Sequence, residues 1–542
     1  MTTPNFNSRR SPVYGRRGIV ASSQPLATAA GLEILSKSGN AADAAVAAAA
    51  ALNVTEPTST GIGGDMFALY FDSHTKQVTA LNGSGRAPAT LTLDRLKKEG
   101  LLADELPPFH AHTVTVPGAC AGWCDLIERH GSLSMSEILA PAIRLAEEGF
   151  PVAPLTSYDW TVGAEGQLKS SLNGRELTID GRAPRAGEIF RNPGLAKSLS
   201  LIARENKQGF YQGQIAEAIA SVIKEAGGCL SEDDLEAHAS TWESPISVNY
   251  RGLRVYECPP NGQGITALIA LNLLEGFDLS SLPSLSIERM HFMIEVMRLA
   301  FADARWYVAD PAFSKIPVEG LLSKEYANER RKLINNKRAT IEPKRGTPVA
   351  SSNTVYLSVV DGSGNACSFI NSNYWGFGTG IVPKGWGFTL QNRGHNFSLD
   401  PGHPNVLAPR KRPYHTIIPA MVTRESDDSL YASYGVMGGF MQPQGHVQVL
   451  SALVDDGLDP QSALDLPRFC IDVEKAGGRV AIEEGMPMKT IEGLAKLGHA
   501  IYKVTGYERS LFGRGQIILR DTETGVLCAG SDPRADGCAM VF

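Results

Sequence analysis

Residues Ser351–Ala366, S-S-N-T-V-Y-L-S-V-V-D-G-S-G-N-A, bring a polar loop directly up to a strand that looks buried. Residues 355–360 are β-formers, and the D-G-S-G that follows is typical of a turn. One threonine, Thr354, stands at the boundary between loop and strand. Upstream of it the sequence is largely helical from about 120 to 340, and downstream it changes to strands and turns.

Thr354 has two interpretations. A threonine hydroxyl is a weak nucleophile, but at a chain N-terminus its own α-amine, whose pKa lies near neutrality, serves as the base. That chemistry requires a cut before Thr354, and residues 335–353, N-N-K-R-A-T-I-E-P-K-R-G-T-P-V-A-S-S-N, look like an exposed, cleavable connector. A threonine that begins a strand can also be there for β-propensity alone. Local chemistry leaves both interpretations open.

The composition excludes several function classes. The 542 residues are 43% hydrophobic and 20% charged, with a formal net charge of −6 and 51 basic residues that form no long run. We therefore expect neither a nucleic-acid nor a membrane partner. The longest apolar run, Ala44–Leu52, is far shorter than the roughly 20 residues that a membrane span needs. No apolar segment follows the charged N-terminus, so we expect a cytoplasmic protein.

Standard cofactor and metal motifs are missing from the sequence. The eight cysteines are too sparse for a disulfide scaffold and form no C-x-x-C pair, so we expect reduced thiols. There is no H-E-x-x-H and no G-x-S-x-G. G-I-V-P-K-G-W (380–386) has Trp386 where a phosphate-binding loop needs lysine, and Ile381 breaks the dinucleotide pattern of G-F-G-T-G. We expect no metal and no organic cofactor.

Helical periodicity predicts helices from Ser22, as the capping residue, to Gly39, then over 41–52, 215–228 and 289–307. Strand patterns predict a pair with a turn near 248–258 and a final pair at 515–519 and 525–529. Helices thus come first and sheets later, without strict βαβ alternation. This order favours an α+β fold of packed layers.

An ordered set of motifs runs along the chain: G-I-V-A-S-S-Q-P-L-A (18–27), Y-R-G-L-R-V-Y-E-C-P-P-N-G-Q-G (250–264), A-F-A-D-A-R-W-Y-V-A-D-P (300–311), T-V-Y-L-S-V-V-D (354–361), M-G-G (437–439) and A-G-S-D-P-R-A-D-G (529–537). From about Gly18 to the last residues, this set resembles the γ-glutamyltransferase family, which includes the γ-glutamyl transpeptidases and the related cephalosporin acylases. The resemblance implies a four-layer αββα sandwich of the N-terminal-nucleophile hydrolases and a precursor that cuts itself in two.

The resemblance also implies roles for particular residues. Thr354 aligns with the family's nucleophile, so cleavage is expected between Asn353 and Thr354, giving residues 1–353 and 354–542, which together form one globular heterodimer. Ser372 stands where the family has a second hydroxyl that hydrogen-bonds the nucleophile. Gly438 and Gly439 match the glycine pair whose backbone N–H groups form the oxyanion hole, where the backbone must approach developing negative charge closely.

The specificity residues depart from the family pattern. The family arginine that holds an α-carboxylate is replaced by Ser84, with an arginine two residues later in N-G-S-G-R-A-P. The ligands of the α-amine are replaced in L-Q-N-R-G-H-N-F-S, and a serine pair is replaced in K-R-P-Y-H-T. The substrate-binding residues expected on this basis are Arg86, Asn373, Tyr374, Arg393, Asn396, His415 and Thr416.

Placing positive charge where the family has negative charge disfavours a cationic α-amine and favours a carboxylate. We therefore expect a threonine amide hydrolase or acyltransferase for a small-molecule amide. Its acyl donor is either γ-glutamyl, as in glutathione, or an uncharged or dicarboxylic group such as glutaryl, as in the cephalosporin acylases. A rival from another class is an uncleaved, non-catalytic binding protein of the same fold. The intact T-V-Y-L-S-V-V-D and M-G-G motifs argue against that rival.

Overall fold

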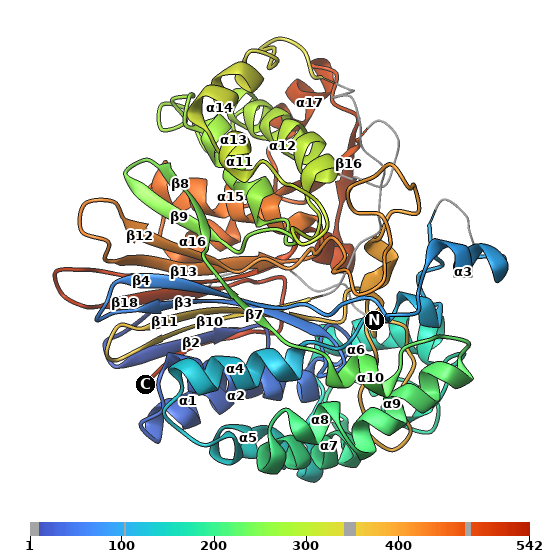
Figure 1. The fold of residues 1–542 in the computed structure, drawn as a ribbon. Helices are drawn as coiled ribbons and strands as arrows, with labels where there is room; N and C mark the ends of the chain where they lie inside the picture. The colour runs from blue at the N-terminus through green and yellow to red at the C-terminus, as the bar shows by residue number, and fades with distance from the viewer. Residues whose placement is uncertain (1–9, 102–104, 341–353, 472–477) are drawn as a thin grey trace.

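The computed structural model of the chain describes residues 10–101, 105–340, 354–471 and 478–542 (Figure 1). Within these residues two seven-stranded sheets form the middle of the molecule, and all strand pairs in them are antiparallel. In order across the first, sheet A, lie β1 (Val13–Gly15), β18 (Leu527–Ser531), β17 (Arg514–Arg520), β13 (Leu430–Met437), β12 (Ala420–Arg424), β9 (Leu253–Glu257) and β8 (Ile246–Tyr250). In order across the second, sheet B, lie β19 (Cys538–Val541), β2 (Gly18–Ser22), β10 (Val355–Asp361), β11 (Ala366–Ser372), β3 (Asp65–Asp72), β4 (Gln77–Gly83) and β7 (Thr241–Glu243).

The two sheets pack face to face. Their shared core brings Ile19, Phe67 and Tyr356 of sheet B against Met421 and Ile518 of sheet A. Two further cores lie on the outer faces of the sheets, each against a layer of helices. Figure 1 shows the resulting order of a helical layer, two sheets and a second helical layer.

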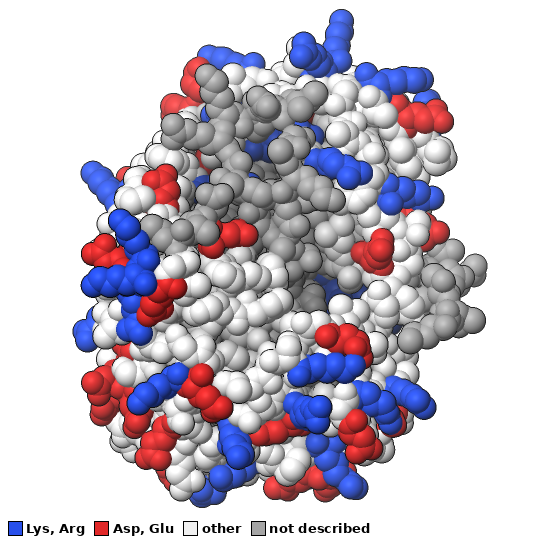
Figure 2. Space-filling view, turned by 90° about the vertical axis from the view of Figure 1, so that its right-hand side faces the viewer, with Lys and Arg blue, Asp and Glu red and all other residues white. Residues whose placement is uncertain are grey.

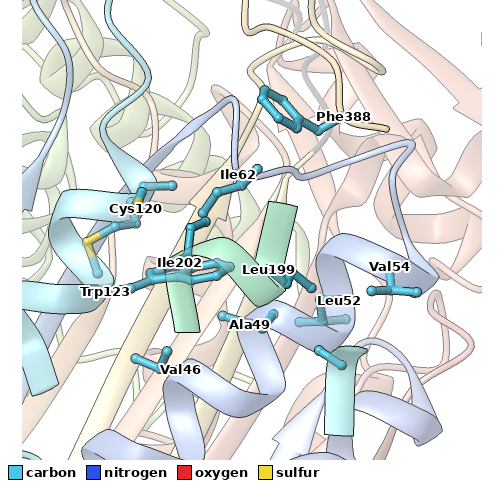
Figure 3. Packing of buried hydrophobic residues seen from close by; sticks show 14 of the residues in the cluster. Val46, Ala49, Leu52, Val54, Ile62, Cys120, Trp123, Leu199, Ile202 and Phe388 are labelled. Carbon is cyan, nitrogen blue, oxygen red and sulfur yellow. The ribbon is translucent and has the colours of Figure 1, made fainter. Parts of the chain in front are cut away.

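The helices on the outer face of sheet B pack closely because their contacting side chains are small. Every residue of α2 (Ala41–Thr55) is buried, and α2 contacts α1 (Pro25–Ser36), β10 and β11. A Cβ atom on Gly31 of α1 would lie only 3.2 Å from the Ala44 carbonyl oxygen of α2. Figure 3 shows Ala49 of α2 beside Trp123 and Leu199. This layer also contains α4 (Ala119–His130), α5 (Met135–Glu148) and α7 (Pro193–Glu205).

The helices beyond sheet A are α11 (Gly264–Leu274), α12 (Ile287–Tyr307) and α15 (Met441–Val454). The other described helices are α3 (Leu93–Lys98), α6 (Pro154–Gly163), α8 (Gln208–Tyr211), α9 (Gln214–Glu225), α10 (Glu232–Glu236), α13 (Val318–Leu321), α14 (Lys324–Arg331), α16 (Pro460–Asp465) and α17 (Met488–Lys496). Smaller sheets join β5 (Phe150–Pro151) to β6 (Ile189–Phe190), and β14 (Phe469–Ile471) to β15 (Val480–Glu483) and β16 (Ile501–Val504). Among these helices none combines the length and the apolar character that a membrane span needs.

Each large sheet combines strands that precede residues 341–353 in the sequence with strands that follow them. β10 and β11 lie between β2 and β3 in sheet B, so the later part of the chain is inserted between strands of the earlier part. In sheet A, β12 pairs with β9 in the same way. Backbone hydrogen bonds therefore join the two parts of the chain in both sheets.

The mixed helix-and-sheet class predicted from the sequence is confirmed, and the two large sheets are antiparallel. The expected order of helices first and sheets later is wrong, because β2, β3, β4, β8 and β9 belong to the first part of the chain. Strands buried on both faces, such as β2, show no alternation of polar and apolar residues, which hides them in the sequence. The predicted helix cap was also wrong: Ser22 lies in β2, and the Gln24 side chain caps α1 by accepting from the Leu26 and Ala27 amides.

All eight cysteines are free thiols, and five of them are buried. On the face shown in Figure 2, Lys and Arg residues are interspersed with Asp and Glu residues. This agrees with the even spread of basic residues along the sequence.

The close approach of the two sheets predicts that Gly435 of β13 tolerates no side chain. A Cβ atom there would lie 2.5–2.8 Å from three atoms of the Tyr356 ring on β10. We expect Gly435→Ala to lower the free energy of unfolding by about 1–3 kcal/mol, measured by urea denaturation, because the ring must shift in a filled core. The matched control is Gly320→Ala in α13, where a Cβ meets nothing within 4 Å and no loss is expected. Equal stability of Gly435→Ala and the unsubstituted chain would contradict this packing.

Candidate active site

The register of two central strands brings two hydroxyl groups together. Thr354 immediately precedes β10, Ser372 ends β11, and Val355 pairs with Asn371. The next position toward the strand ends therefore sets Thr354 opposite Ser372, with Thr354 Oγ1 3.1 Å from Ser372 Oγ. Both side chains are fully buried. The predicted contact between these two hydroxyls is present in the structure.

Two N–H groups donate to the Ser372 hydroxyl oxygen. The Tyr374 backbone N–H donates to Ser372 Oγ at 2.8 Å, and Arg393 Nη2 donates to it at 3.3 Å. A serine hydroxyl has two lone pairs and one proton. The contact between Ser372 Oγ and Thr354 Oγ1 is a hydrogen bond in which either hydroxyl can be the donor.

Arg393 is a fully buried cation that joins three parts of the site. Its Nη1 donates to Thr416 Oγ1 at 2.7 Å, and its Nε lies 3.9 Å from Asp65 Oδ2. Its guanidinium carbon stands 4.4 Å from the centre of the Tyr374 ring. Burial lowers the pKa of Arg393 to about 10, while the neighbouring Asp65 charge opposes that shift. The guanidinium is therefore charged at pH 7.

Asp65, the first residue of β3, balances this charge. Burial alone would raise the pKa of its carboxyl, but the hydrogen bond from His415, the Arg393 charge and the Gly85 amide together hold that pKa below its usual range. Asp65 Oδ1 accepts from Gly85 N at 2.9 Å and from Gln391 Nε2 at 3.1 Å, and Oδ2 accepts from His415 Nε2 at 3.0 Å. Both carboxylate oxygens are thus occupied by groups of the protein.

His415 is neutral in this cluster. Burial first, and then the nearby Arg393 charge, lower its pKa to about 4, against the opposing effect of Asp65. Its Nδ1 accepts the Ile417 backbone N–H at 3.4 Å, which leaves the ring proton on Nε2 for Asp65. Around pH 7 the cluster therefore consists of one cation, one anion and a neutral imidazole.

The glycine pair lies where β13 ends and α15 begins. Gly438 and Gly439 have φ angles of +132° and +58°, values that side chains rarely allow. Ser358 of β10 faces Ser433 of β13, and Tyr356 faces Gly435. A step of two residues toward the start of β10 therefore corresponds to a step of two residues toward the end of β13. Continuing this pattern sets Thr354 across from the residue just before Gly438.

Gln263, which precedes α11, connects this glycine turn to the arginine. Its Nε2 donates to the Thr416 carbonyl at 2.6 Å and to the Gly439 carbonyl at 2.9 Å. Its Oε1 accepts from the Tyr414 hydroxyl at 2.9 Å. One buried amide therefore holds the two segments that flank the hydroxyl pair.

The remaining predicted residues divide into two groups. Tyr374 Oη donates to Asn396 Oδ1 at 2.5 Å, and Asn396 Nδ2 donates to the Tyr414 carbonyl at 3.1 Å, so both belong to the Arg393 environment. Asn373 instead packs against the 61–64 turn, and its Nδ2 donates to Thr389 Oγ1 at 3.1 Å. Half-buried Arg86 instead donates to the Ala239 carbonyl at 3.2 Å. Asn353 lies outside the described residues.

Sequence reasoning missed three residues of this network: Asp65, Gln263 and Gln391. Asp65 follows a glycine pair in G-I-G-G-D, and an acid that enters an otherwise apolar strand is the signal that could have found it. Gln263 lies within P-P-N-G-Q-G, a motif that had been noted without a role. Gln391 carries no local signal, because its partners are distant in the sequence.

Comparison with known proteins gives consistent results. The family model described as Gamma-glutamyltranspeptidase matches residues 27–542. The glutathione hydrolase-like YwrD proenzyme of Bacillus subtilis is 39% identical over 97% of this chain and 99% of that protein. The acylase ACY 1 proenzyme of Pseudomonas sp. strain V22 is 33% identical over 99% of this chain and 96% of that protein. The crystal structure of cephalosporin acylase from Bacillus halodurans superposes with a TM-score of 0.92, at 46% identity, over 100% of this chain and 99% of that one.

The neutral state of His415 predicts a pH dependence of stability. The unfolded histidine has a pKa of about 6.5 and takes up a proton as the pH falls from 7 to 5, whereas folded His415, with a pKa of about 4, does not. The unfolded state therefore binds more protons, and the free energy of unfolding decreases as the pH is lowered from 7 to 5. We expect His415→Gln, which keeps a donor toward Asp65, to reduce this fall by about 2 kcal/mol.

Urea denaturation at pH 7 and at pH 5 measures this difference. Other buried histidines, such as His446, whose pKa burial lowers to about 3, act in the same direction in both proteins. His74→Gln is the control, because His74 is exposed and its loss should leave the fall unchanged. A His415→Gln chain with the full fall in stability would show that His415 is not held neutral.

Proposed function

Because the chain belongs to the gamma-glutamyltranspeptidase family, we propose that it is a self-processing amide hydrolase with Thr354 as its N-terminal nucleophile. The observation that carries this proposal is the buried pair of Thr354 Oγ1 and Ser372 Oγ at the head of β10, 3.1 Å apart and oriented by N–H donors. The order of helices, sheet, sheet and helices supports assignment to the αββα sandwich of the N-terminal-nucleophile hydrolases.

Processing is proposed at the Asn353–Thr354 bond. The Thr354 hydroxyl attacks the Asn353 carbonyl carbon, and the peptide bond is exchanged for an ester in an N-to-O acyl shift. Water then hydrolyses the ester and leaves two chains, residues 1–353 and 354–542, with the Thr354 α-amine free. The shared sheets, in which β10 pairs with both β2 and β11, keep the two products together as a heterodimer.

In the mature enzyme the freed α-amine is the base. It takes the Thr354 hydroxyl proton while Oγ1 attacks the substrate carbonyl carbon, with Ser372 Oγ within hydrogen-bond distance of Oγ1. The oxyanion is stabilised by the backbone N–H groups of Gly438 and Gly439. The α-amine returns the proton to the leaving amine, and an acyl ester on Thr354 remains. Water, activated by the same amine, hydrolyses this ester.

The substrate class follows from the charges next to the hydroxyl pair. Arg393 donates to Ser372, which in turn contacts Thr354, so only Ser372 lies between the charged guanidinium and the proposed nucleophile. Asp65 is the acid beside it, and both of its oxygens already accept protein donors. A substrate ammonium would find no free acceptor there, whereas a carboxylate would find a cation. We therefore propose an acyl group that ends in a carboxylate and lacks an α-amine, such as glutaryl.

A γ-glutamyl donor is the second candidate. The observation in its favour is the 39% identity to a protein named as glutathione hydrolase-like. The neighbour named as a cephalosporin acylase is similar over the whole chain as well, so these names do not separate the two candidates. The charges around Arg393 favour the carboxylate without an amine.

Self-processing is tested by mass. The purified unsubstituted protein should separate under denaturing conditions into residues 1–353 and 354–542, and Thr354→Ala should remain one chain of 58.1 kDa. Amide hydrolysis by that variant should fall about 10³-fold or more, because the nucleophile is lost. Thr354→Ser keeps a hydroxyl and should still split. A Thr354→Ala chain that splits at the same bond would refute the assignment.

Acyl specificity is tested by comparing glutaryl, γ-glutamyl and uncharged valeryl anilides on processed enzyme. We expect glutaryl to be the best of the three. Arg393→Met should lower kcat/KM for glutaryl anilide about 30- to 100-fold more than for valeryl anilide, because a charge-assisted hydrogen bond is worth about 2–3 kcal/mol.

Two variants control for general damage. Arg393→Lys keeps the charge without the fork and should recover part of the preference for glutaryl. Arg86→Met removes an arginine outside the network and should leave the ratio of the rates unchanged. A strong preference for γ-glutamyl anilide, or an equal loss for glutaryl and valeryl in Arg393→Met, would overturn the role of Arg393 as the carboxylate receptor.

A further inference from the structure

A second cluster of ligand-type side chains lies in the helical layer beyond sheet A. His291 and Glu295 come from α12, and His499 lies between α17 and β16. One possible ligand atom from each of the three lies within 4.8 Å of the others. All three side chains are buried, with exposures of 1%, 2% and 4%. None of them takes part in the Thr354 network described above, and Figure 1 shows α12 and α17 on the outer side of sheet A.

Local geometry prepares these side chains to converge. His291 and Glu295 are four residues apart on one helix, so they lie on the same face. His291 Nε2 donates to the Asn335 carbonyl at 2.8 Å, which leaves the Nδ1 lone pair facing His499 Nε2, also at 2.8 Å. A histidine whose other ring nitrogen donates to a backbone carbonyl is the usual arrangement of a metal ligand.

Glu295 provides an independent sign of a missing partner. Its Oε2 accepts from the Thr340 backbone N–H at 2.9 Å, but its Oε1 has no hydrogen-bond partner. Arg298 Nε is 3.9 Å from Oε1, too far for a hydrogen bond, and the terminal nitrogens of Arg298 donate to the carbonyls of Thr340 and Gly478. A buried carboxylate oxygen without a partner is costly.

A purely structural explanation accounts for only part of this arrangement. If His499 donates to His291, each ring uses one nitrogen in that bond, but His499 Nδ1 and Glu295 Oε1 both stay without partners. The bond from Thr340 and the distant Arg298 charge hold the carboxylate but leave Oε1 without a hydrogen-bond donor. A cation held between the ring nitrogens and the carboxylate explains the convergence of all three side chains.

We propose that His291, Glu295 and His499 bind one divalent transition-metal ion, with zinc as the best match to two imidazoles and one carboxylate. Metal ligation requires neutral histidines. His291 and His499 are 208 residues apart in the sequence, so no local motif reveals the set.

The site would tie together segments on both sides of residues 341–353. Two ligands come from α12, and the third comes from the last quarter of the chain. Asn335 and Thr340, which contact His291 and Glu295, belong to the segment that leads toward Thr354. Only the following point rests on the proposed processing. If the chain is cut before Thr354, the ion would join the two product chains and hold the segment that contains Asn335 and Thr340.

Metal binding is tested on the Thr354→Ala chain as well as on the unsubstituted protein, so that the result does not depend on cleavage or activity. After chelation and dialysis, each should take up one equivalent of Zn²⁺, with a rise in Tm. Co²⁺ should give the visible absorption of a site with nitrogen and oxygen ligands. No stoichiometric binding and no shift in Tm would overturn the proposal, even if Thr354 proves to be the nucleophile.

The ligands are tested with isosteric changes. Glu295→Gln and His499→Gln should each lose the stoichiometric Zn²⁺ binding and the Co²⁺ absorption. Circular dichroism and the Tm of the metal-free proteins show whether each variant has folded. His74→Gln, which removes an exposed imidazole, should bind as the unsubstituted chain does. Full Zn²⁺ binding by both folded ligand variants would also refute the site, because the ion would then be held elsewhere on the surface.

Discussion

The burial of the Arg393 guanidinium is the constraint on which the candidate active site depends. A charged group with five N–H donors and no acceptor can stay in a protein interior only if surrounding oxygens take up its hydrogen bonds and an anion balances its charge. Ser372 and Thr416 each accept a hydrogen bond from Arg393, Asp65 balances its charge, and each of the three comes from a different segment. Satisfying one cation therefore orders the hydroxyl beside Thr354, the loop that follows the arginine and the first residue of β3. If Arg393 receives the acyl carboxylate as proposed, recognition and reactivity share one side chain.

Local sequence patterns predicted the elements whose causes are local. The helix α2 follows from its run of alanines, α12 from its helical period and β10 from a run of β-formers. Motif resemblance added the contact between Thr354 and Ser372, which the strand register brings about. Asp65 and Gln263 remained hidden because their partners lie far away in the sequence and only the fold brings them together. For the same reason the cap of α1 was assigned to Ser22, which is instead committed to β2.

Two sets of buried polar groups follow different physical rules in this protein. Around Asp65 the oxygens are saturated by protein donors, so the charge is fixed in place and little freedom is left for an outside ligand to compete. At Glu295 one oxygen is left over in an equally dry environment. A saturated anion stabilises the arrangement that already exists, whereas an oxygen without a hydrogen-bond donor favours a further donor or cation. The number of partners, more than the residue type, thus separates a positioning group from a candidate ligand.

The alternation of early and late strands in both sheets has a consequence for how the molecule can come into being. Since β10 and β11 sit between β2 and β3, neither part of the chain has a complete sheet of its own. Each part, made separately, would present long unpaired edges to the solvent and to other molecules, which is a route to aggregation. Both sheets can therefore form only while the chain is continuous. A chain that is cut afterwards keeps the fold that formed while it was continuous. Its two pieces do not encode that fold separately, so once unfolded they would not regain it.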